Sequence, residues 1–206
     1  MEILSPVEVR VLGALLEKDM TTPEYYPLTL NSLQAACNQK SNREPVVNYH
    51  EELVANALDL GMHKGLVTRI SGAGHRVEKF GHRLGEKLNL GRRELALLCV
   101  LMLRGPQTVG ELRGRSERMH EFADMDEVEH CLEALAAHEP EPLVARAARG
   151  RWVQLFGGPV DAAGTVEPAA PLDHSANHPS LEHRIETLEQ ELAQLKQQFE
   201  EFRKQF

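Results

Sequence analysis

The stretch 48–80, NYHEELVANALDLGMHKGLVTRISGAGHRVEKF, joins an amphipathic helix pattern to two short apolar segments through a glycine-containing turn. Apolar or small residues recur at i, i+3, i+4 and i+7, which gives a helix one buried face. These residues are Val54, Ala57, Leu58 and Gly61, and we expect a wider stripe that also includes Tyr49, Leu53 and Leu60. The spacing therefore predicts a helix that packs on a core.

The second part of this stretch predicts a β-hairpin. Gly61 and Gly65 are expected to end the helix, because glycine is frequent at helix C-termini. Residues 66–70 and 76–80 have the composition of two strands, and residues 71–74 supply turn residues that can adopt positive φ. A helix followed directly by such a hairpin is typical of a winged-helix domain.

The preceding residues supply two more helices. Ser5 and Pro6 predict an N-cap and a first helical position, and this helix should end near Lys18. The segment 21–30 is rich in proline and threonine and is predicted to be a loop. Thr29 or Asn31 should cap a second helix that ends near Cys37, and residues 38–46 then form a polar loop.

The same order of patterns recurs after residue 86, with small changes in spacing that indicate loops of different length. The sequence thus predicts two tandem winged-helix domains, at 1–85 and 86–157. Both are mainly α-helical with small β-hairpin wings, which is an α+β class.

The C-terminal part has a different character. Residues 158–180 show no apolar period and are predicted to be a flexible linker, whereas residues 181–206 carry a heptad pattern. We expect this helix to form a parallel homodimeric coiled coil, although a single helix that packs back on its own domains remains the alternative. The apolar seam consists of Leu181, Ile185, Leu188, Leu192, Leu195, Phe199, Phe202 and Phe206.

Four segments resemble signature stretches of the YceH family of bacterial proteins. They are TTPEYYPLTLNSL, ACNQKSNREPV, GHRVEKFGHR and RGPQTVGELRGRSERMHEF, and the resemblance covers about residues 1–157. The resemblance implies a tandem winged-helix protein without an established activity, so it supplies no catalytic residues. Winged helices serve both as DNA readers and as protein-binding modules.

Composition favours a cytoplasmic protein without a membrane span. The longest apolar run, residues 95–103, is far shorter than the roughly 20 residues that a transmembrane helix needs. The N-terminus lacks the pattern of a secretory signal. The three cysteines form no CxxC pair and are expected to be buried thiols: Cys37, Cys99 and Cys131.

Two groups of residues could suggest a metal site or a catalytic triad, but neither has the pattern that such a site needs. The first is a histidine cluster in and beside the predicted linker, which has no cysteine or carboxylate at ligand spacing: His174, His178 and His183. The second lacks any sign of an activated nucleophile: Ser116, His120 and Asp124. We therefore expect no enzymatic activity, no metal and no cofactor.

The distribution of charge predicts which parts of the protein would contact DNA. The net charge is −8, and residues 158–206 hold most of the excess, with nine acidic and four basic side chains. The outward faces of both predicted third helices are acidic, which disfavours insertion into a major groove. Basic residues gather instead in the loops and wings, where they are candidates for phosphate contact: Lys40, Arg43, His75, Arg76, Lys79, Arg113, Arg115, Arg118, Arg146, Arg149 and Arg151.

Two functional hypotheses follow. The first is a DNA-associated, regulator-like protein that contacts double-stranded DNA through its wings and loops. The alternative is a dimeric adaptor that binds a protein partner through its winged helices and does not bind DNA.

Overall fold

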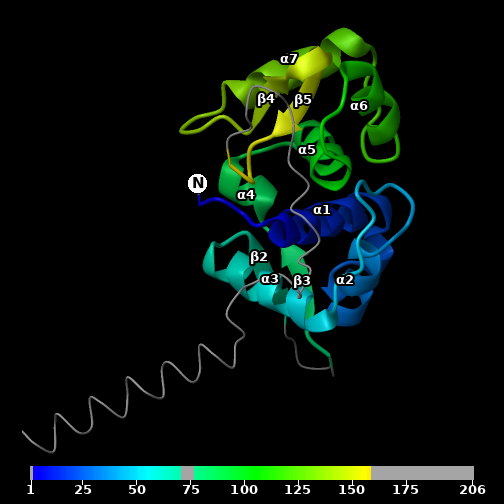
Figure 1. Ribbon diagram of the computed structural model, residues 1–206, viewed down its shortest axis with the longest axis vertical. Coiled ribbons are helices and arrows are strands. Elements are labelled where there is room, and N and C mark those ends of the chain that lie inside the picture. The colour runs from blue at the N-terminus through cyan, green and yellow to red at the C-terminus, as the bar shows by residue number, and fades with distance from the viewer. Residues whose placement is uncertain (1, 71–76, 159–206) are drawn as a thin grey trace, which may run out of the picture. The chain divides into compact units, whose positions relative to one another are not determined.

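Helix α1 (Pro6–Thr21) begins at a capping box in the computed structural model, which describes residues 2–70 and 77–158 (Figure 1). The Ser5 hydroxyl accepts a hydrogen bond from the Glu8 N–H at 3.3 Å, and the Glu8 carboxylate accepts one from the Ser5 N–H at 2.9 Å. Both N–H groups would otherwise lack a partner within the helix. The predicted cap is confirmed, but the helix extends beyond its predicted end at Lys18.

The prediction of a loop over residues 21–30 is wrong in part. This segment contains a 3-10 turn, η1 (Pro23–Tyr25), and a two-residue strand, β1 (Leu28–Thr29). Strand β1 pairs antiparallel with β3 (Lys79–His82), which lies far away in the sequence. Because the pairing is short and non-local, the residues themselves show no strand period.

Helices α2 (Leu30–Cys37) and α3 (Glu51–His63) follow, and Thr29 caps α2 as predicted. The four residues of the central stripe of α3 are buried, as the spacing predicts. The wider stripe is wrong at Leu53 and Leu60, which are 38% and 48% exposed, whereas Tyr49 is partly buried and packs against the core. Gly61 also lies within the helix, so Gly65, with φ of +67°, is the glycine that terminates it.

The predicted hairpin is present, with a shift in its second strand. Strand β2 (Val67–Ile70) pairs antiparallel with β3, so that Val67 lies opposite His82 and Ile70 opposite Lys79. The pairing includes Gly81, where an added Cβ would lie 3.0 Å from the Tyr26 hydroxyl. A buried glycine gives no apolar signal, and the predicted strand at 76–80 was therefore placed too early. The sheet order is β1-β3-β2.

The second half repeats the order of the first after a short helix, α4 (Leu84–Leu88), that the sequence did not predict. Gly91 is the N-cap residue of the next helix. Thr108 and Glu111 form a capping box like that of Ser5 and Glu8. The remaining elements are α5 (Arg92–Arg104), α6 (Val109–Ser116), α7 (Met125–Ala136), β4 (Val144–Ala147), η2 (Ala148–Gly150) and β5 (Arg151–Gln154).

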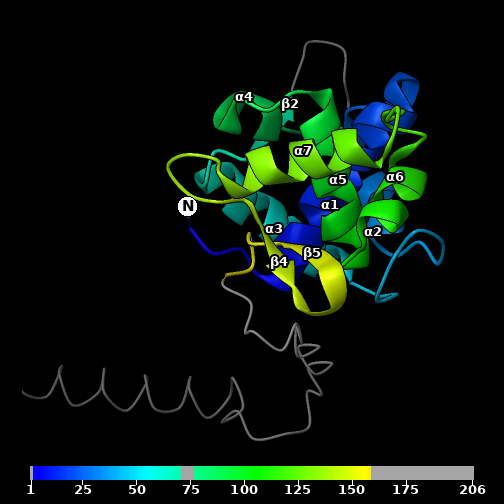
Figure 2. The ribbon, with the colours of Figure 1, turned by 90° about the horizontal axis from the view of Figure 1, so that it is seen from above.

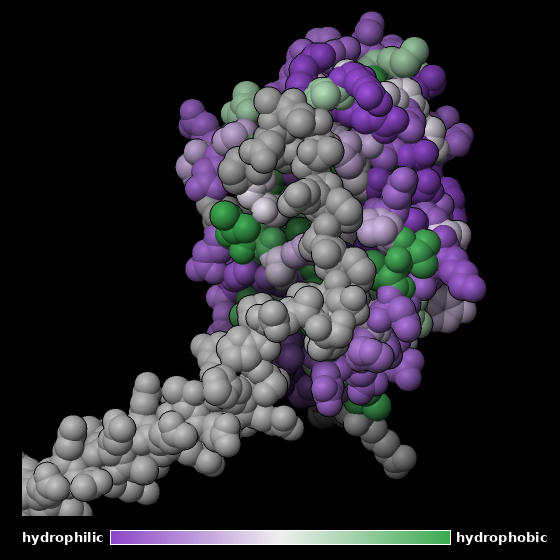
Figure 3. All heavy atoms as spheres, viewed as in Figure 1, coloured by the Kyte–Doolittle hydropathy of each residue, from purple (hydrophilic) through white to green (hydrophobic). Residues whose placement is uncertain are grey.

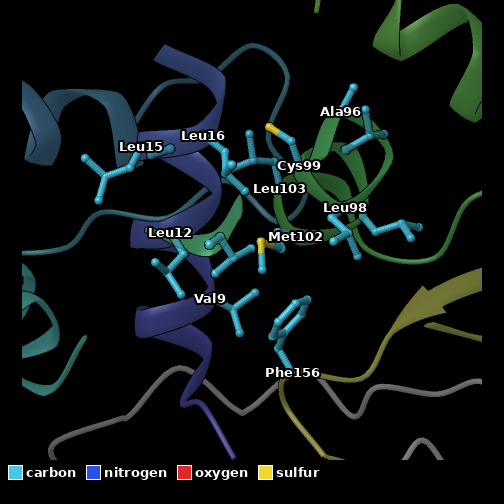
Figure 4. Close-up of a cluster of buried hydrophobic side chains, with 14 of the residues drawn as sticks. Val9, Leu12, Leu15, Leu16, Ala96, Leu98, Cys99, Met102, Leu103 and Phe156 are labelled. Atoms are coloured by element: carbon cyan, nitrogen blue, oxygen red, sulfur yellow. The ribbon is translucent and has the colours of Figure 1, made fainter. Parts of the chain in front are cut away.

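Helices α1 and α5 pack against each other, and this contact joins the buried residues of both halves in one hydrophobic core (Figure 4). The approach is close, because an added Cβ at Gly13 would lie 2.9 Å from a methyl carbon of Leu103. The Cys99 thiol also donates to the Gly13 carbonyl at 3.4 Å. Helix α5 lies between α1 and α7 in both ribbon views (Figures 1 and 2).

The described residues thus form a mixed α+β structure with seven α-helices and two small antiparallel sheets. In those same ranges, no helix has the length and apolar character needed to cross a membrane. The predicted linker, beyond Gly158, and the predicted coiled coil at 181–206 with its seam residues lie outside the described residues.

Candidate nucleic-acid and protein interfaces

The loop between α2 and α3 holds two predicted phosphate contacts in opposite environments. Lys40 is exposed and has no ion pair with another described residue. Arg43 is buried, with a fully inaccessible side chain that binds Glu17 of α1 at 2.6 Å. Its guanidinium also donates to the Ala36 carbonyl at the end of α2. Because its donors are used inside the protein, we leave Arg43 out of any surface interface.

The arginines of α6 are also largely occupied. Arg113 donates to the carbonyl groups of Phe122 and Ala123, at 3.3 and 2.8 Å. Arg115 donates to Gln107, and its guanidinium lies 3.5 Å from the Glu111 carboxylate. Arg118, just beyond the helix, is exposed and makes no hydrogen bond or ion pair within the described part of the chain.

The second hairpin has one unengaged arginine between two engaged ones. Arg146 lies 2.5 Å from the carboxylate of Glu129 on α7, and its guanidinium carbon lies 4.8 Å from the Trp152 ring centroid. Arg149 sits at the tip in the left-handed conformation, with φ of +59°, and is exposed. Only Arg149 among these residues is therefore positioned to contact a phosphate without first breaking an internal bond.

Arg151 is held at the base of the second hairpin by Glu111. Its guanidinium donates to the Glu111 carboxylate at 2.9 Å and to the Pro106 carbonyl at 2.8 Å. The hydrogen bond from the Thr108 N–H is the main cause of a lowered pKa of Glu111, and the charges of Arg151 and Arg115 lower it further. The two arginines thus stabilise the cap of α6.

In the first hairpin, Lys79 is half-buried and forms no ion pair with the described residues. Predicted contacts His75 and Arg76 lie outside the described residues. Four predicted cations therefore remain unengaged within the described ranges: Lys40, Lys79, Arg118 and Arg149.

The exposed side of α3 combines carboxylates with leucines, and sequence reasoning recognised only the carboxylates. Glu52 and Asp59 are exposed and pair with no cation among the described residues. Leu53 and Leu60 lie beside them on the helix surface. By contrast, the described residues visible in Figure 3 are mostly hydrophilic, with hydrophobic side chains gathered in a few places.

A cleft of about 400 Å³ lies where the end of α3, helix α4 and the segment before β4 meet. Its cations are bonded to the protein: Lys64 lies 2.6 Å from the buried Glu8 carboxylate, and Lys87 donates to the Lys64 carbonyl. The His138 ring nitrogens lie 2.9 and 3.3 Å from the carbonyl oxygens of Leu88 and Glu141. No sequence motif marks this cleft, because its residues come from both halves. The contacts make it a junction between them.

Two of the three residues that sequence reasoning set aside as a catalytic triad have structural roles. The Ser116 hydroxyl donates to the Arg113 carbonyl, and Asp124 caps α7 by accepting from the Glu127 N–H at 2.8 Å. The three cysteines are buried free thiols, as predicted. Burial raises the pKa of Cys37 and Cys131 to about 12.

Comparison with known proteins identifies the family. Residues 4–151 match the family model described as "Protein of unknown function, DUF480". A UPF0502 protein of Solibacter usitatus is 52% identical over 206 residues, which cover 98% of each chain. The chain belongs to this family.

Other UPF0502 relatives agree with this assignment. One from Opitutus terrae is 53% identical over 81% of this chain and 75% of its own length. The protein named YceH in Salmonella paratyphi A is 45% identical over 96% and 94% of the two chains. The resemblance to the YceH family is thereby confirmed, and the family description assigns no activity.

Proposed function

We propose that this UPF0502 protein is a non-enzymatic, cytoplasmic adaptor that binds a protein partner through tandem winged-helix domains. The repeated order of three helices and an antiparallel hairpin supports the winged-helix assignment. The buried free thiols suit a reducing compartment.

The surface of α3 is the observation that carries the proposal. A winged helix that reads DNA places its third helix near phosphates, where cationic side chains are favourable. Here that helix exposes Glu52 and Asp59 without cationic partners in the described ranges, together with Leu53 and Leu60. Two leucines in one row on a helix offer apolar surface that a protein partner can bury, whereas a phosphate gains nothing from them.

DNA association through wings and loops is the second candidate. The four unengaged cations favour it, and arginine is well suited to bind phosphate. The same charge distribution limits the affinity, because the other described arginines proposed for contact already bind carboxylates, carbonyl groups or a side-chain amide. Any such binding should be weak and lost as salt rises.

The heptads at 181–206 lead us to propose a parallel homodimer as well. A dimer would present two copies of each α3 surface and so increase avidity for a multivalent partner. Sedimentation of the full chain at tens of micromolar tests this, with Leu188→Lys/Leu195→Lys as the variant. A monomeric parent, or a variant that still dimerises, contradicts the coiled coil.

Site-specific photo-crosslinking separates the adaptor from the DNA candidate. A photoreactive residue at Asn56, on the exposed side of α3, should give discrete protein adducts in cells, whereas the same residue at exposed His130 of α7 should not. In parallel, a mixed duplex is titrated at about 50 mM salt, where phosphate contacts are strong. Duplex binding that Arg149→Ala weakens, without adducts at position 56, favours DNA and overturns the adaptor.

A further inference from the structure

We propose that the exposed strip of α3 binds a lysine- or arginine-rich amphipathic helix of a protein partner. The strip, here called the α3 strip, comprises Leu53, Asn56 and Leu60 with Glu52 and Asp59 alongside. This inference rests on the proposed adaptor function and adds the chemistry of the partner.

The spacing of the leucines fits a helical ligand. Leu53, Asn56 and Leu60 stand at i, i+3 and i+7, so they form one row along two turns of α3. The leucines remain 38% and 48% exposed, and each offers apolar surface to a partner. An amphipathic helical ligand carries its own apolar anchors at this spacing, so they can align with the leucine row of α3.

The second repeat lacks these apolar residues at equivalent positions. With Val54 aligned to Val128, Leu53 corresponds to Glu127 and Leu60 to Ala134. Glu127 has a local role in α7, because its carboxylate accepts from the Ala123 N–H at 2.8 Å. The apolar row is therefore particular to α3 and is not required by the repeated fold.

The two repeats differ at one of the two carboxylate positions: Asp59 corresponds to Glu133 of α7, which has a cationic partner, whereas Glu52 corresponds to Asp126, which has none among the described residues. On α7, Arg146 of strand β4 lies 2.5 Å from Glu129 and 3.8 Å from Glu133. The equivalent residue of strand β2 is Arg69, which instead lies 3.1 Å from Glu78.

Glu52 and Asp59 are thus left without a cation from any described part of the chain. The two carboxylates lie along one side of the leucine row, so a ligand with apolar anchors and cations along one edge complements both features. An exposed pair of this kind adds modest affinity but excludes acidic competitors.

Two other occupants have the wrong charge. DNA phosphates would be repelled by Glu52 and Asp59 and would leave the leucines in water. Residues 181–206 of this chain carry six acidic and four basic side chains, so they also fit an acidic strip poorly. A basic amphipathic helix is the occupant that satisfies both the leucines and the carboxylates.

Fluorescence anisotropy with the full-length protein tests the proposal. The probe is a labelled 18-residue amphipathic peptide of leucine and lysine, and the comparison peptide has glutamate in place of lysine. We expect binding of the lysine peptide only. The Leu53→Ala/Leu60→Ala variant should lose at least about tenfold in affinity, and the Glu52→Gln/Asp59→Asn variant at least about threefold.

A matched control corrects for the acidity of the whole protein. Glu117→Gln/Glu121→Gln makes the same change in charge at exposed carboxylates of the second repeat and should leave the affinity within about twofold. Circular dichroism establishes that each variant is folded. Equal loss in this control, unchanged binding in the leucine variant, or tighter binding of a peptide of residues 181–206 would overturn the proposal.

The outcomes also separate this inference from the adaptor function. Protein adducts at position 56 combined with no binding of the lysine peptide leave the adaptor in place and overturn the basic partner. Binding of the lysine peptide that depends on both Leu60 and Asp59 supports both the adaptor function and a basic partner.

Discussion

Replacing Arg43 with alanine should lower the free energy of unfolding by about 3–5 kcal/mol, because it removes the hydrogen-bonded partner of the Glu17 carboxylate and leaves it with Lys18 at 3.8 Å. The guanidinium lies 3.1 and 2.6 Å from the two Glu17 oxygens, so the pair is bidentate. Arg43 has no exposed side-chain surface, and the Glu17 side chain is only 12% exposed. Water can therefore replace little of what the substitution removes.

Two further contacts place the effect at the upper part of that range. Arg43 donates twice to the Ala36 carbonyl, in the last turn of α2, where carbonyl groups lack partners within the helix. It also donates to the Gln39 side chain at 3.2 Å. A domain is stable by about 5–15 kcal/mol in total, so Arg43→Ala should bring the chain close to unfolding.

Urea unfolding followed by circular dichroism measures this change. The matched control is Arg69→Ala, whose ion pair with Glu78 has side chains 46% and 56% exposed and should contribute less than about 1 kcal/mol. Glu17→Gln/Arg43→Met should cost less than the two single changes together, because it removes both charges. A loss below about 1 kcal/mol in Arg43→Ala, or full additivity in the double variant, would refute the reasoning.

Three other changes test other parts of the fold. Gly13→Ala should destabilise the protein by about 1–3 kcal/mol, because the new methyl group would meet Leu103 where α1 crosses α5; a calorimetric melt with unchanged midpoint would contradict this close approach. Burial raises the pKa of Glu8, but hydrogen bonds from Lys64 and Ser5 outweigh this effect and leave the pKa lowered. The parent should therefore have a higher free energy of unfolding than Lys64→Met near pH 7, and this difference should shrink as pH falls through the lowered pKa. Urea titrations at both ends of this pH range measure the difference. Because burial raises the pKa of Cys37 to about 12, the native protein should react with a thiol reagent at pH 8 far more slowly than the unfolded chain, and equal rates would contradict it.

The sequence predicted the helices and hairpins that have a local signal. Ser5, Thr29 and Thr108 precede apolar periods, and all three cap helices in the structure. Strand β1 and helix α4 have no such signal, because one is a two-residue strand and the other is a five-residue helix. Their stability comes from residues distant in the chain.

The candidate interface was less predictable, because a charged residue does not reveal its partner in the sequence. Arg43 meets Glu17 only after α1 and α2 have packed, and Arg146 meets Glu129 only after the hairpin returns to α7. Leu53 and Leu60 fitted a broad apolar stripe, yet they lie at its edge and are partly exposed. The width of a buried face depends on what packs against it.

The two repeats have similar net charges, but their charged side chains are paired differently. Residues 1–85 carry nine basic and ten acidic side chains, and residues 86–157 carry ten and twelve. In the second repeat, Arg146 is paired with Glu129 and Glu133 of α7, whereas in the first Arg69 is paired within its own hairpin. A third helix attracts a charged partner mainly through side chains that have no ion pair within the protein, because paired charges are already compensated. Asp59 of α3 therefore has no cationic partner among the described residues, whereas Glu133, at the equivalent position of α7, has Arg146 at 3.8 Å.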